Sequence, residues 1–217
     1  MQYVKPMANL LDMAVLLSGG GRTLENIGSR IQEGRLNARL KVVVSSRAGV
    51  KGLERAADLG VPTHVVSPKE FADTKSFSKA IFDLLRANEA EVVCNAGFLS
   101  LLDIPEDYRW RVVNIHPALL PSFGGHGMYG HHVHEAVLNA GCKVSGCTVH
   151  YADQTYDTGP IIVQRTCPVF EDDTPKTLAA RVFEQECLAY PEALRLIAEG
   201  RVKVEGPRTR LLPPLGT

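Results

Sequence analysis

The sequence has no surplus of charge of either sign. Its 217 residues include 24 Lys and Arg and 24 Asp and Glu, so the formal net charge is zero. Proteins that bind nucleic acid without sequence preference need a basic surplus on one face, because they neutralise phosphates. We therefore expect no nucleic-acid partner, although a local basic pocket for one anionic small molecule is compatible with this balance.

Long hydrophobic runs are also absent. A membrane helix needs about 18 or more apolar residues in a row. The apolar run from Leu10 to Leu17 is too short and contains Asp12. Residues Met1 to Ala8 are mixed in polarity and do not resemble a signal peptide. The sequence thus predicts no membrane partner.

Cysteine is sparse and shows no pairing pattern. The five cysteines are an odd number, and no Cys-x-x-Cys motif occurs. Most of them lie in apolar strand or helix patterns, which predict buried free thiols. Such thiols are typical of a reducing compartment, so we expect a cytoplasmic protein. The residues are Cys94, Cys142, Cys147, Cys167 and Cys187.

The first half of the sequence alternates strand and helix patterns. The expected strands are 13–17, 41–45, 62–66, 91–96 and 111–115, and the expected helices are 23–33, 52–59 and 76–87. Strands separated by such helices form right-handed βαβ units and a parallel sheet. The sequence predicts an α/β fold: a Rossmann-like, mostly parallel sheet with helices on both faces. No linker or repeat interrupts the chain, so we expect one domain over residues 1–217.

After Pro121 the pattern changes. The predicted elements are a loop at 122–130, a helix at 132–140, two antiparallel strands at 143–151 and 160–169, a helix from 174 to about 199 with a bend at Pro191, and an edge strand at 202–204. Thr174 followed by Pro175 is a typical helix start. We expect the Pro-rich tail that follows to be loose.

Three polar residues form the strongest candidate site. Asn114 and His116 end an apolar strand at positions i and i+2, so they lie on the same face at its end. Ligands of open parallel sheets bind beyond the carboxyl ends of the strands. Asp157 lies in a turn-forming run directly after the next strand pattern. An amide donor, an imidazole and a carboxylate can stabilise an oxyanion and move a proton. Alternatively, they are a strand cap, a structural histidine and a turn residue.

Three consecutive glycines stand between the first strand and the first helix. The run Ser18-Gly-Gly-Gly21 precedes Arg22 and Thr23. A glycine loop at a helix N-terminus lets backbone amides approach an anion. The run is neither Gly-x-Gly-x-x-Gly nor a Walker loop, which favours a phosphomonoester over a dinucleotide or triphosphate. A tight turn without a ligand is the alternative.

Four histidines cluster in the second half. They are His126, His131, His132 and His134. No His-Glu-x-x-His motif is present, and only Glu135 lies at a usable ligand spacing. We expect no metal here, and interpret the cluster as a loop and helix start that contact an anionic ligand.

These motifs, spread over residues 13 to 203, resemble those of the phosphoribosylglycinamide formyltransferase family, the folate-dependent transformylases of purine synthesis. Asn-x-His-Pro-x-Leu-Leu-Pro with a downstream Asp-x-Gly-Pro is the most specific part. The matching segments are Leu16-Leu-Ser-Gly-Gly-Gly-Arg-Thr-Leu24, Asn95-Ala-Gly-Phe-Leu99, Asn114-Ile-His-Pro-Ala-Leu-Leu-Pro121, Gly146-Cys-Thr-Val-His150, Asp157-Thr-Gly-Pro160 and Glu184-Gln-Glu-Cys-Leu-Ala-Tyr-Pro191.

The resemblance implies a formyltransferase fold with a nucleotide-phosphate half, about 13–112, and a folate and catalytic half, about 113–205. It implies that Asn114, His116 and Asp157 perform the transfer. It assigns the substrate's ribose phosphate to Gly20, Gly21, Arg22 and Thr23, and its glycinamide end to Glu186. It assigns the folate to Leu99, Ser100, Leu101, Leu102 and Asp153, together with Asn114 and Asp157.

The implied reaction transfers the formyl group of 10-formyltetrahydrofolate, a co-substrate, to the amine of 5'-phosphoribosylglycinamide. The products are N-formylglycinamide ribonucleotide and tetrahydrofolate, in de novo purine biosynthesis. No metal is needed, both partners are small molecules, and the protein is expected to be a monomer or homodimer.

The sequence departs from the family pattern at several positions. The commoner phosphate loop has Ser-Asn where this chain has Arg22-Thr23. An arginine is common where Ser100 stands, and a folate-contacting arginine has no match near Thr74 and Lys75. The loop from Phe123 to Gly130 is longer than in the commonest members. Contacts to phosphate and in this loop must therefore differ.

Other functions compete with this one. A sugar-nucleotide N-formyltransferase is the main alternative. A non-catalytic nucleotide-binding module would use the glycine loop but leave Asn114, His116 and Asp157 without a common role. Methionyl-tRNA formyltransferase has a further carboxyl-terminal domain, and formyltetrahydrofolate hydrolase has an amino-terminal one. We expect neither here, because only about twelve residues precede the first strand and the net charge does not favour tRNA.

Overall fold

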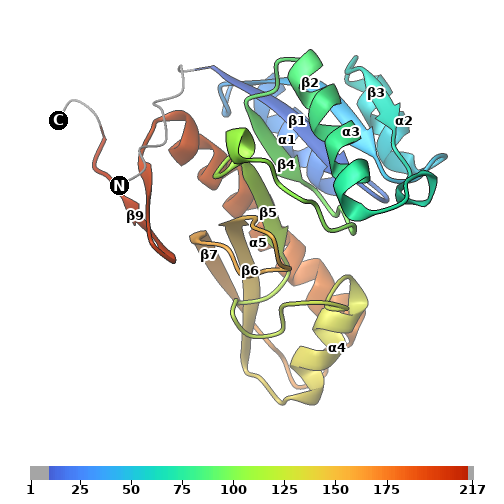
Figure 1. The fold of residues 1–217 in the computed structure, drawn as a ribbon. Helices are drawn as coiled ribbons and strands as arrows, with labels where there is room; N and C mark the ends of the chain where they lie inside the picture. Colours follow the sequence, from blue (N-terminus) through green and yellow to red (C-terminus); the bar gives the residue numbers. More distant parts are fainter. Residues whose placement is uncertain (1–9, 215–217) are drawn as a thin grey trace.

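A computed structural model describes residues 10–214 of the chain (Figure 1). The strands are β1 (Leu11–Leu17), β2 (Ala38–Ser45), β3 (Thr63–Val65), β4 (Val92–Asn95), β5 (Val112–His116), β6 (Val144–Tyr151), β7 (Ile161–Pro168), β8 (Val202–Glu205) and β9 (Arg208–Leu211). The helices are α1 (Arg22–Gln32), α2 (Lys51–Asp58), α3 (Thr74–Ala87), α4 (His131–Asn139) and α5 (Pro175–Ala198), with short 3-10 turns at Pro68–Glu70 and Glu106–Tyr108.

Seven strands form the central sheet in the order β3-β2-β1-β4-β5-β6-β7. The first five of these are parallel, whereas β6 runs antiparallel to both β5 and β7. The predicted mostly parallel sheet and the predicted antiparallel pair are confirmed. The order reverses between β1 and β4, because β2 lies on one side of β1 and β4 on the other. Such a reversal leaves a crevice beyond the strand ends where ligands bind.

Both faces of the sheet are covered (Figure 1). Alternate residues of β1 enter different cores, because successive side chains of a strand point to opposite faces. Met13 and Val15 join a cluster that includes residues of α1 and α5, and Leu16 joins a second cluster with residues of α3. The predicted helices on both faces are therefore confirmed.

Helix α5 fastens the centre of the sheet from one side. Thr174 and Thr177 form a capping box at its start, and Pro175 occupies the first turn, as predicted. The helix continues through Pro191 to Ala198. The fully buried Tyr190 hydroxyl lies 2.7 Å from the carbonyl oxygen of Val113 and 3.1 Å from that of Asn95. This contact ties α5 to β4 and β5 where those strands lead into the crevice.

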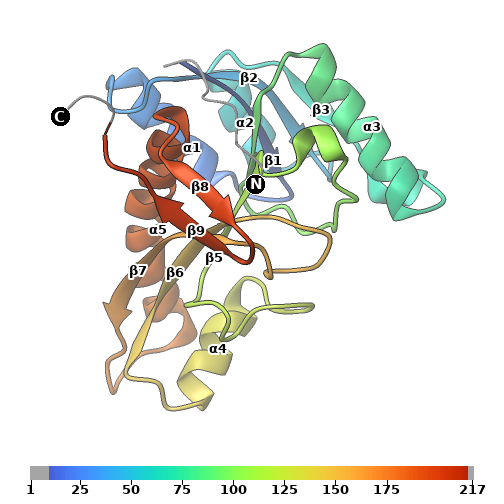
Figure 2. The same cartoon turned by 60° about the vertical axis from the view of Figure 1, so that its left-hand side comes forward.

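The carboxyl-terminal region differs from the prediction. The expected edge strand at 202–204 is β8, but it pairs with β9 in a separate two-stranded sheet rather than with the main one (Figure 2). The tail was expected to be loose, which is wrong for Arg208–Leu211. Gly206, with φ of 62°, lets the chain reverse between the two strands. The Thr209 hydroxyl donates to the Ile161 carbonyl and fastens this hairpin to β7.

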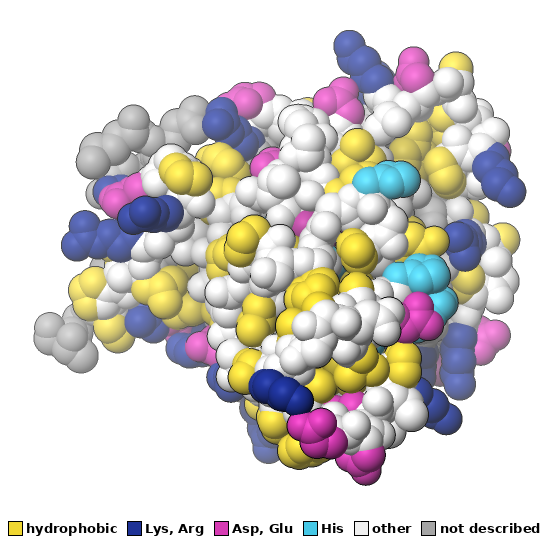
Figure 3. Space-filling view, turned by 90° about the horizontal axis from the view of Figure 1, so that it is seen from below, with side chains coloured by type: hydrophobic (Ala, Val, Ile, Leu, Met, Phe, Trp, Pro, Cys, Tyr) yellow, Lys and Arg dark blue, Asp and Glu magenta, His cyan; other side chains and the backbone are white. Residues whose placement is uncertain are grey.

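The structure also bears on the predictions made from charge, hydrophobic runs and cysteines. Basic and acidic side chains are interspersed on the face seen in Figure 3. No helix within residues 10–214 is long and apolar enough to cross a bilayer. All five cysteines are free; Cys94, Cys147 and Cys167 are buried and the other two are partly buried. The prediction for Met1 to Ala8 falls outside the described residues.

Candidate active site

A cavity of about 550 Å³ opens in the crevice at the carboxyl ends of β1, β4 and β5. The glycine loop forms one wall, the loop after β4 another, and the end of β5 the floor. Every residue predicted for the site lines this one cavity. These are Gly20, Gly21, Arg22, Thr23, Leu99, Ser100, Leu101, Leu102, Asn114, His116, Asp153, Asp157 and Glu186. Their roles remain predictions, but the structure brings all of them to one location.

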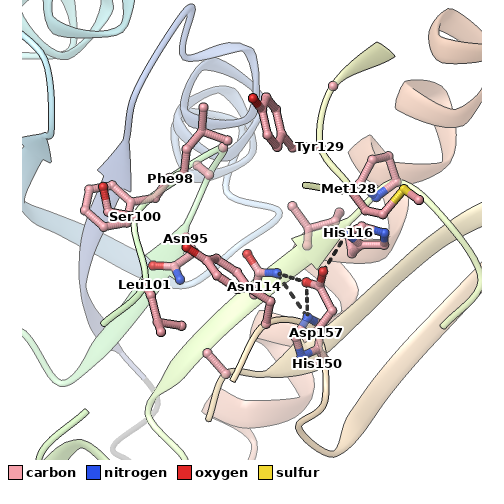
Figure 4. Close-up of a pocket in the computed structure, with 18 of the residues that line it drawn as sticks. Asn95, Phe98, Ser100, Leu101, Asn114, His116, Met128, Tyr129, His150 and Asp157 are labelled. Carbon is pink, nitrogen blue, oxygen red and sulfur yellow. Dashed lines mark hydrogen bonds and ion pairs between the residues drawn. The ribbon is translucent and has the colours of Figure 1, made fainter. Parts of the chain in front are cut away.

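Asp157 is the centre of the polar cluster (Figure 4). Its Oδ1 lies 3.3 Å from Asn114 Nδ2, and its Oδ2 lies 3.4 Å from His116 Nδ1. The Gly125 amide donates to Oδ2 at 3.0 Å, and His150 Nε2 lies 3.6 Å from Oδ1. The side chain is only 9% exposed. Burial raises the pKa of Asp157, but these contacts outweigh it and hold the pKa below its ordinary value.

His150 was not predicted as a site residue. The antiparallel register places it opposite Asn114, and places Thr148 opposite His116. Thr148 and His150 are thus polar residues at i and i+2 of a buried strand, the same signal that identified Asn114 and His116. That signal was present in the sequence and could have identified His150.

The partners of His150 set which ring nitrogen carries the hydrogen and how Asn114 is oriented. Its Nδ1 lies 2.9 Å from the Tyr151 carbonyl oxygen, which can only accept, so Nδ1 carries the proton. In the neutral ring Nε2 then accepts from Asn114 Nδ2 at 3.0 Å. The Asn114 amide is therefore turned with its donor nitrogen toward the cluster.

His116 is held between two acceptors. Its Nε2 donates to the Phe123 carbonyl at 2.8 Å, and its Nδ1 faces Asp157. The doubly protonated ring satisfies both partners. Burial nevertheless lowers the pKa of His116, and the Asp157 charge and the Phe123 carbonyl offset only part of this effect. The ring is thus built to hold a proton near a carboxylate and to release it readily.

The loop that carries Asp157 is tightly constrained. Asp157 has φ of 60°, a left-handed conformation that is strained for a residue other than glycine. The Asp153 carboxylate, which was predicted to contact folate, accepts from the Thr155 amide at 3.1 Å and from the Thr158 hydroxyl at 2.8 Å. A Cβ on Gly159 would lie 1.9 Å from the Tyr151 carbonyl oxygen. These contacts keep the strained residue in place.

Conformation and packing require a glycine at one position of the glycine loop but not at its neighbour. Gly21 has φ of 73°, and a Cβ there would lie 2.6 Å from the Cα of Gly52 in α2. Gly21 is therefore required by conformation and packing. At Gly20 a Cβ would meet only Arg55, at 3.8 Å. Arg55 donates to the Gly20 carbonyl and pairs with Glu25 at 3.0 Å, so it braces the loop from behind.

Glu186 reaches the cavity from α5. The residue is only partly exposed, and desolvation of the carboxyl group raises its pKa to about 7, with the Arg22 charge opposing the shift. A carboxylate with this pKa changes charge near neutral pH.

The four histidines do not form one cluster. His126 lines the cavity and packs edge-on against Tyr156, with ring centres 5.8 Å apart. His134 is 4% exposed, and its Nδ1 has no hydrogen-bond partner among the described residues. The exposed side chains of His131, His132 and Glu135 have ligand atoms within 4.8 Å of one another, outside the cavity lining. The absence of a metal therefore stays a prediction.

Comparison with known proteins shows the family to which the chain belongs. The formyl transferase family model matches residues 11–194, which is most of the chain. The chain belongs to the formyl transferase family, and its sheet has the formyltransferase fold.

Three similar proteins give a more specific comparison than the family model does. A crystal structure of glycinamide ribonucleotide transformylase 1 from Symbiobacterium toebii is 38% identical, with a TM-score of 0.90, and the match covers 98% of this chain and 99% of that one. The chloroplastic phosphoribosylglycinamide formyltransferase of Arabidopsis thaliana is 39% identical over 196 residues, 88% of this chain and 66% of that protein. The trifunctional purine biosynthetic protein adenosine-3 of Gallus gallus is 40% identical over 202 residues, and this chain spans 20% of its length.

Gly20 and Gly21 of the glycine loop should respond differently to substitution. Gly21→Ala should lower the melting temperature, because the new Cβ is strained and collides with α2. Gly20→Ala should leave the melting temperature within about 2 °C, because the new Cβ would come no closer than 3.8 Å to any residue other than its chain neighbours, at Arg55. Thermal melts of the two variants test this difference. Equal destabilisation by the two substitutions would contradict this account.

Asp157→Asn keeps the shape of the side chain and removes its charge. If Asp157 supports proton transfer, kcat should fall roughly 100-fold or more, while substrate dissociation constants change little. Asp172→Asn, which removes an exposed carboxylate, is the matched control. The double variant His116→Ala/Asp157→Asn should be little worse than the poorer single variant, because the two act as a unit. Near-wild-type kcat for Asp157→Asn would reduce Asp157 to a turn residue.

Proposed function

We propose that this chain transfers the formyl group of 10-formyltetrahydrofolate to the amine of 5'-phosphoribosylglycinamide. The observation that carries the proposal is the junction of three features in one cavity: the glycine loop, the loop after β4, and the Asn114, His116 and Asp157 cluster between them. The likeness to glycinamide ribonucleotide transformylases supports the same assignment.

In the proposed reaction the substrate amine attacks the formyl carbon, and a new carbon–nitrogen bond forms. The formyl oxygen becomes an oxyanion, for which the donors are the Asn114 amide and the protonated His116 ring, which exchanges one of its contacts with Phe123 and Asp157 for the oxyanion. Each well-placed donor lowers such a barrier by roughly 3 kcal/mol. Without substrate both Asn114 Nδ2 protons face His150 and Asp157, the latter at 3.3 Å. The longer bond is the one that the oxyanion replaces.

Collapse of the intermediate breaks the bond between the formyl carbon and the folate nitrogen. The proton lost by the attacking amine must reach that nitrogen. Asp157 accepts it through a water, and His116 gives a proton to the leaving nitrogen, which its lowered pKa favours. Asp157 then returns a proton to His116, whose Nδ1 lies 3.4 Å from its Oδ2, so both residues regain their starting states and no metal takes part.

The remaining assignments complete the proposal. Gly20, Gly21, Arg22 and Thr23 bind the substrate phosphate, and Glu186 binds the glycinamide end. Leu99 to Leu102 and Asp153 line the folate part of the cavity. Balanced charge and unpaired cysteines support a cytoplasmic enzyme with only small-molecule partners. We infer one functional domain, formed by a phosphate half and a folate half, in a monomer or homodimer.

An absorbance assay of 10-formylfolate consumption tests the function. Purified protein should turn over with 5'-phosphoribosylglycinamide, give N-formylglycinamide ribonucleotide by mass spectrometry, and keep its rate after exhaustive chelation. Amino-sugar nucleotides serve as competing substrates. Faster turnover with an amino-sugar nucleotide would favour the sugar-nucleotide reaction, and binding without turnover would favour a non-catalytic module.

Glu186 predicts a distinct pH dependence. Its pKa of about 7 means that the carboxylate is ionised above neutral pH and protonated below it. The KM for phosphoribosylglycinamide should therefore rise as the pH falls from 8 to 6, beyond the effect of the amine's own protonation. Glu186→Gln should raise the KM at pH 8 and remove that additional rise. Glu184→Gln, an exposed neighbour on α5, is the control and should leave the profile unchanged. A profile that is the same in the wild type and Glu186→Gln would exclude this role.

A further inference from the structure

A cation–π contact joins the glycine loop to helix α5. The guanidinium carbon of Arg22 lies 3.6 Å from the centre of the Phe183 ring, which is van der Waals distance over its face. Arg22 is the first residue of α1 and lines the cavity. Phe183 is half-buried on α5 and is not among the residues that line the cavity. Any influence of Phe183 on a ligand therefore acts through Arg22.

Arg22 forms no ion pair with another residue in the range 10–214. Among residues 10–214, no carboxylate oxygen lies within 4.0 Å of its guanidinium nitrogens. Two other arginines show the contrast. Arg55, behind the same loop, pairs with Glu25 at 3.0 Å. Arg181 stacks on Phe170 at 4.1 Å but is also bound by Asp173 at 2.6 Å. Within the part of the chain that the structure describes, Arg22 thus stacks on an aromatic ring and has no carboxylate in an ion pair with it.

Helix α5 thus acts on the cavity through two side chains. Phe183 and Glu186 are three residues apart, and side chains at this spacing lie on one face of a helix. Glu186 presents a carboxylate to the cavity directly, whereas Phe183 contacts the cation of Arg22, whose charge also acts on the Glu186 carboxyl group. A ligand that carries both a phosphate and an amine matches this pair of charges.

We propose that Phe183 is a positioning residue, which holds the Arg22 guanidinium at the phosphate end of the cavity in readiness for a phosphomonoester dianion. This inference rests on the proposed function for the identity of the substrate. An arginine side chain has several rotatable bonds, and ordering it when a ligand binds costs conformational entropy. Stacking on Phe183 removes much of that freedom beforehand, so affinity for the phosphate increases.

Binding of ribose 5-phosphate and of inorganic phosphate, followed by calorimetry at low salt, tests the proposal without requiring turnover. Phe183→Leu keeps an apolar side chain but removes the ring face, and should weaken ribose 5-phosphate binding about fivefold. Phe183→Tyr should restore binding. Phe170→Leu, which removes the equivalent stack from Arg181, should have no effect. Melting temperatures confirm that each variant is folded.

A double-mutant cycle separates positioning from a general structural role. In an Arg22→Ala background, Phe183→Leu should produce no further loss of affinity, because its effect passes through Arg22. Equal losses in both backgrounds, unchanged affinity of Phe183→Leu, or no phosphate binding by the wild type would each overturn the proposal. In steady-state assays Phe183→Leu should raise the KM for phosphoribosylglycinamide and leave kcat and the folate KM unchanged. A wild type that binds ribose 5-phosphate in this manner but does not turn over would refute the proposed function alone.

Discussion

The buried carboxylate of Asp157 is the interaction on which the rest of the site depends. A charge removed from water destabilises a fold unless hydrogen bonds and opposite charge compensate it. Here the Asn114 side chain, the Gly125 backbone amide and the His116 ring face one carboxylate, and His150 orients Asn114 beside it. These partners come from β5, β6 and the loop after β5. The need to satisfy a single anion therefore brings three separate segments together and fixes the orientation of the groups that act on substrate.

The sheet supplies the geometry that makes this compensation possible. Parallel strands β1 and β4 end at the same edge, and the reversal of strand order between them opens the cavity. The change to antiparallel pairing at β6 then brings a strand back beside the end of β5, so His150 lies opposite Asn114. A sheet with only parallel strands would place no side chain of a returning strand at that position. Helix α5 packs against the same strands, and its Tyr190 hydroxyl contacts the carbonyl oxygens of Asn95 in β4 and Val113 in β5.

Much of the fold and site could be predicted because the evidence for them is local. Strand alternation placed Asn114 and His116 on one face, and the turn pattern identified Asp157. The β8–β9 hairpin was missed because strands of only four residues, joined through Gly206 and Pro207, give little pattern. His150 was missed because its importance comes from register, which depends on the partner strand. The contact of Arg22 with Phe183 joins residues far apart in the sequence, and no local pattern reveals such a pair.

The pairing of β5 with β6 also determines where the length of the chain can change without disturbing the site and where it cannot. Asn114 faces His150 and His116 faces Thr148 whatever the length of the connection between the two strands, which runs over residues 117–143 and contains α4. Phe123 and Gly125 in this connection contact His116 and Asp157, so only a change of length beyond Gly125 would alter the rim of the cavity and leave the reacting groups in place. A single-residue deletion inside β6 would instead turn His150 to the opposite face. Chain length is therefore tolerant in one half of the connection and fixed in the strand that follows it.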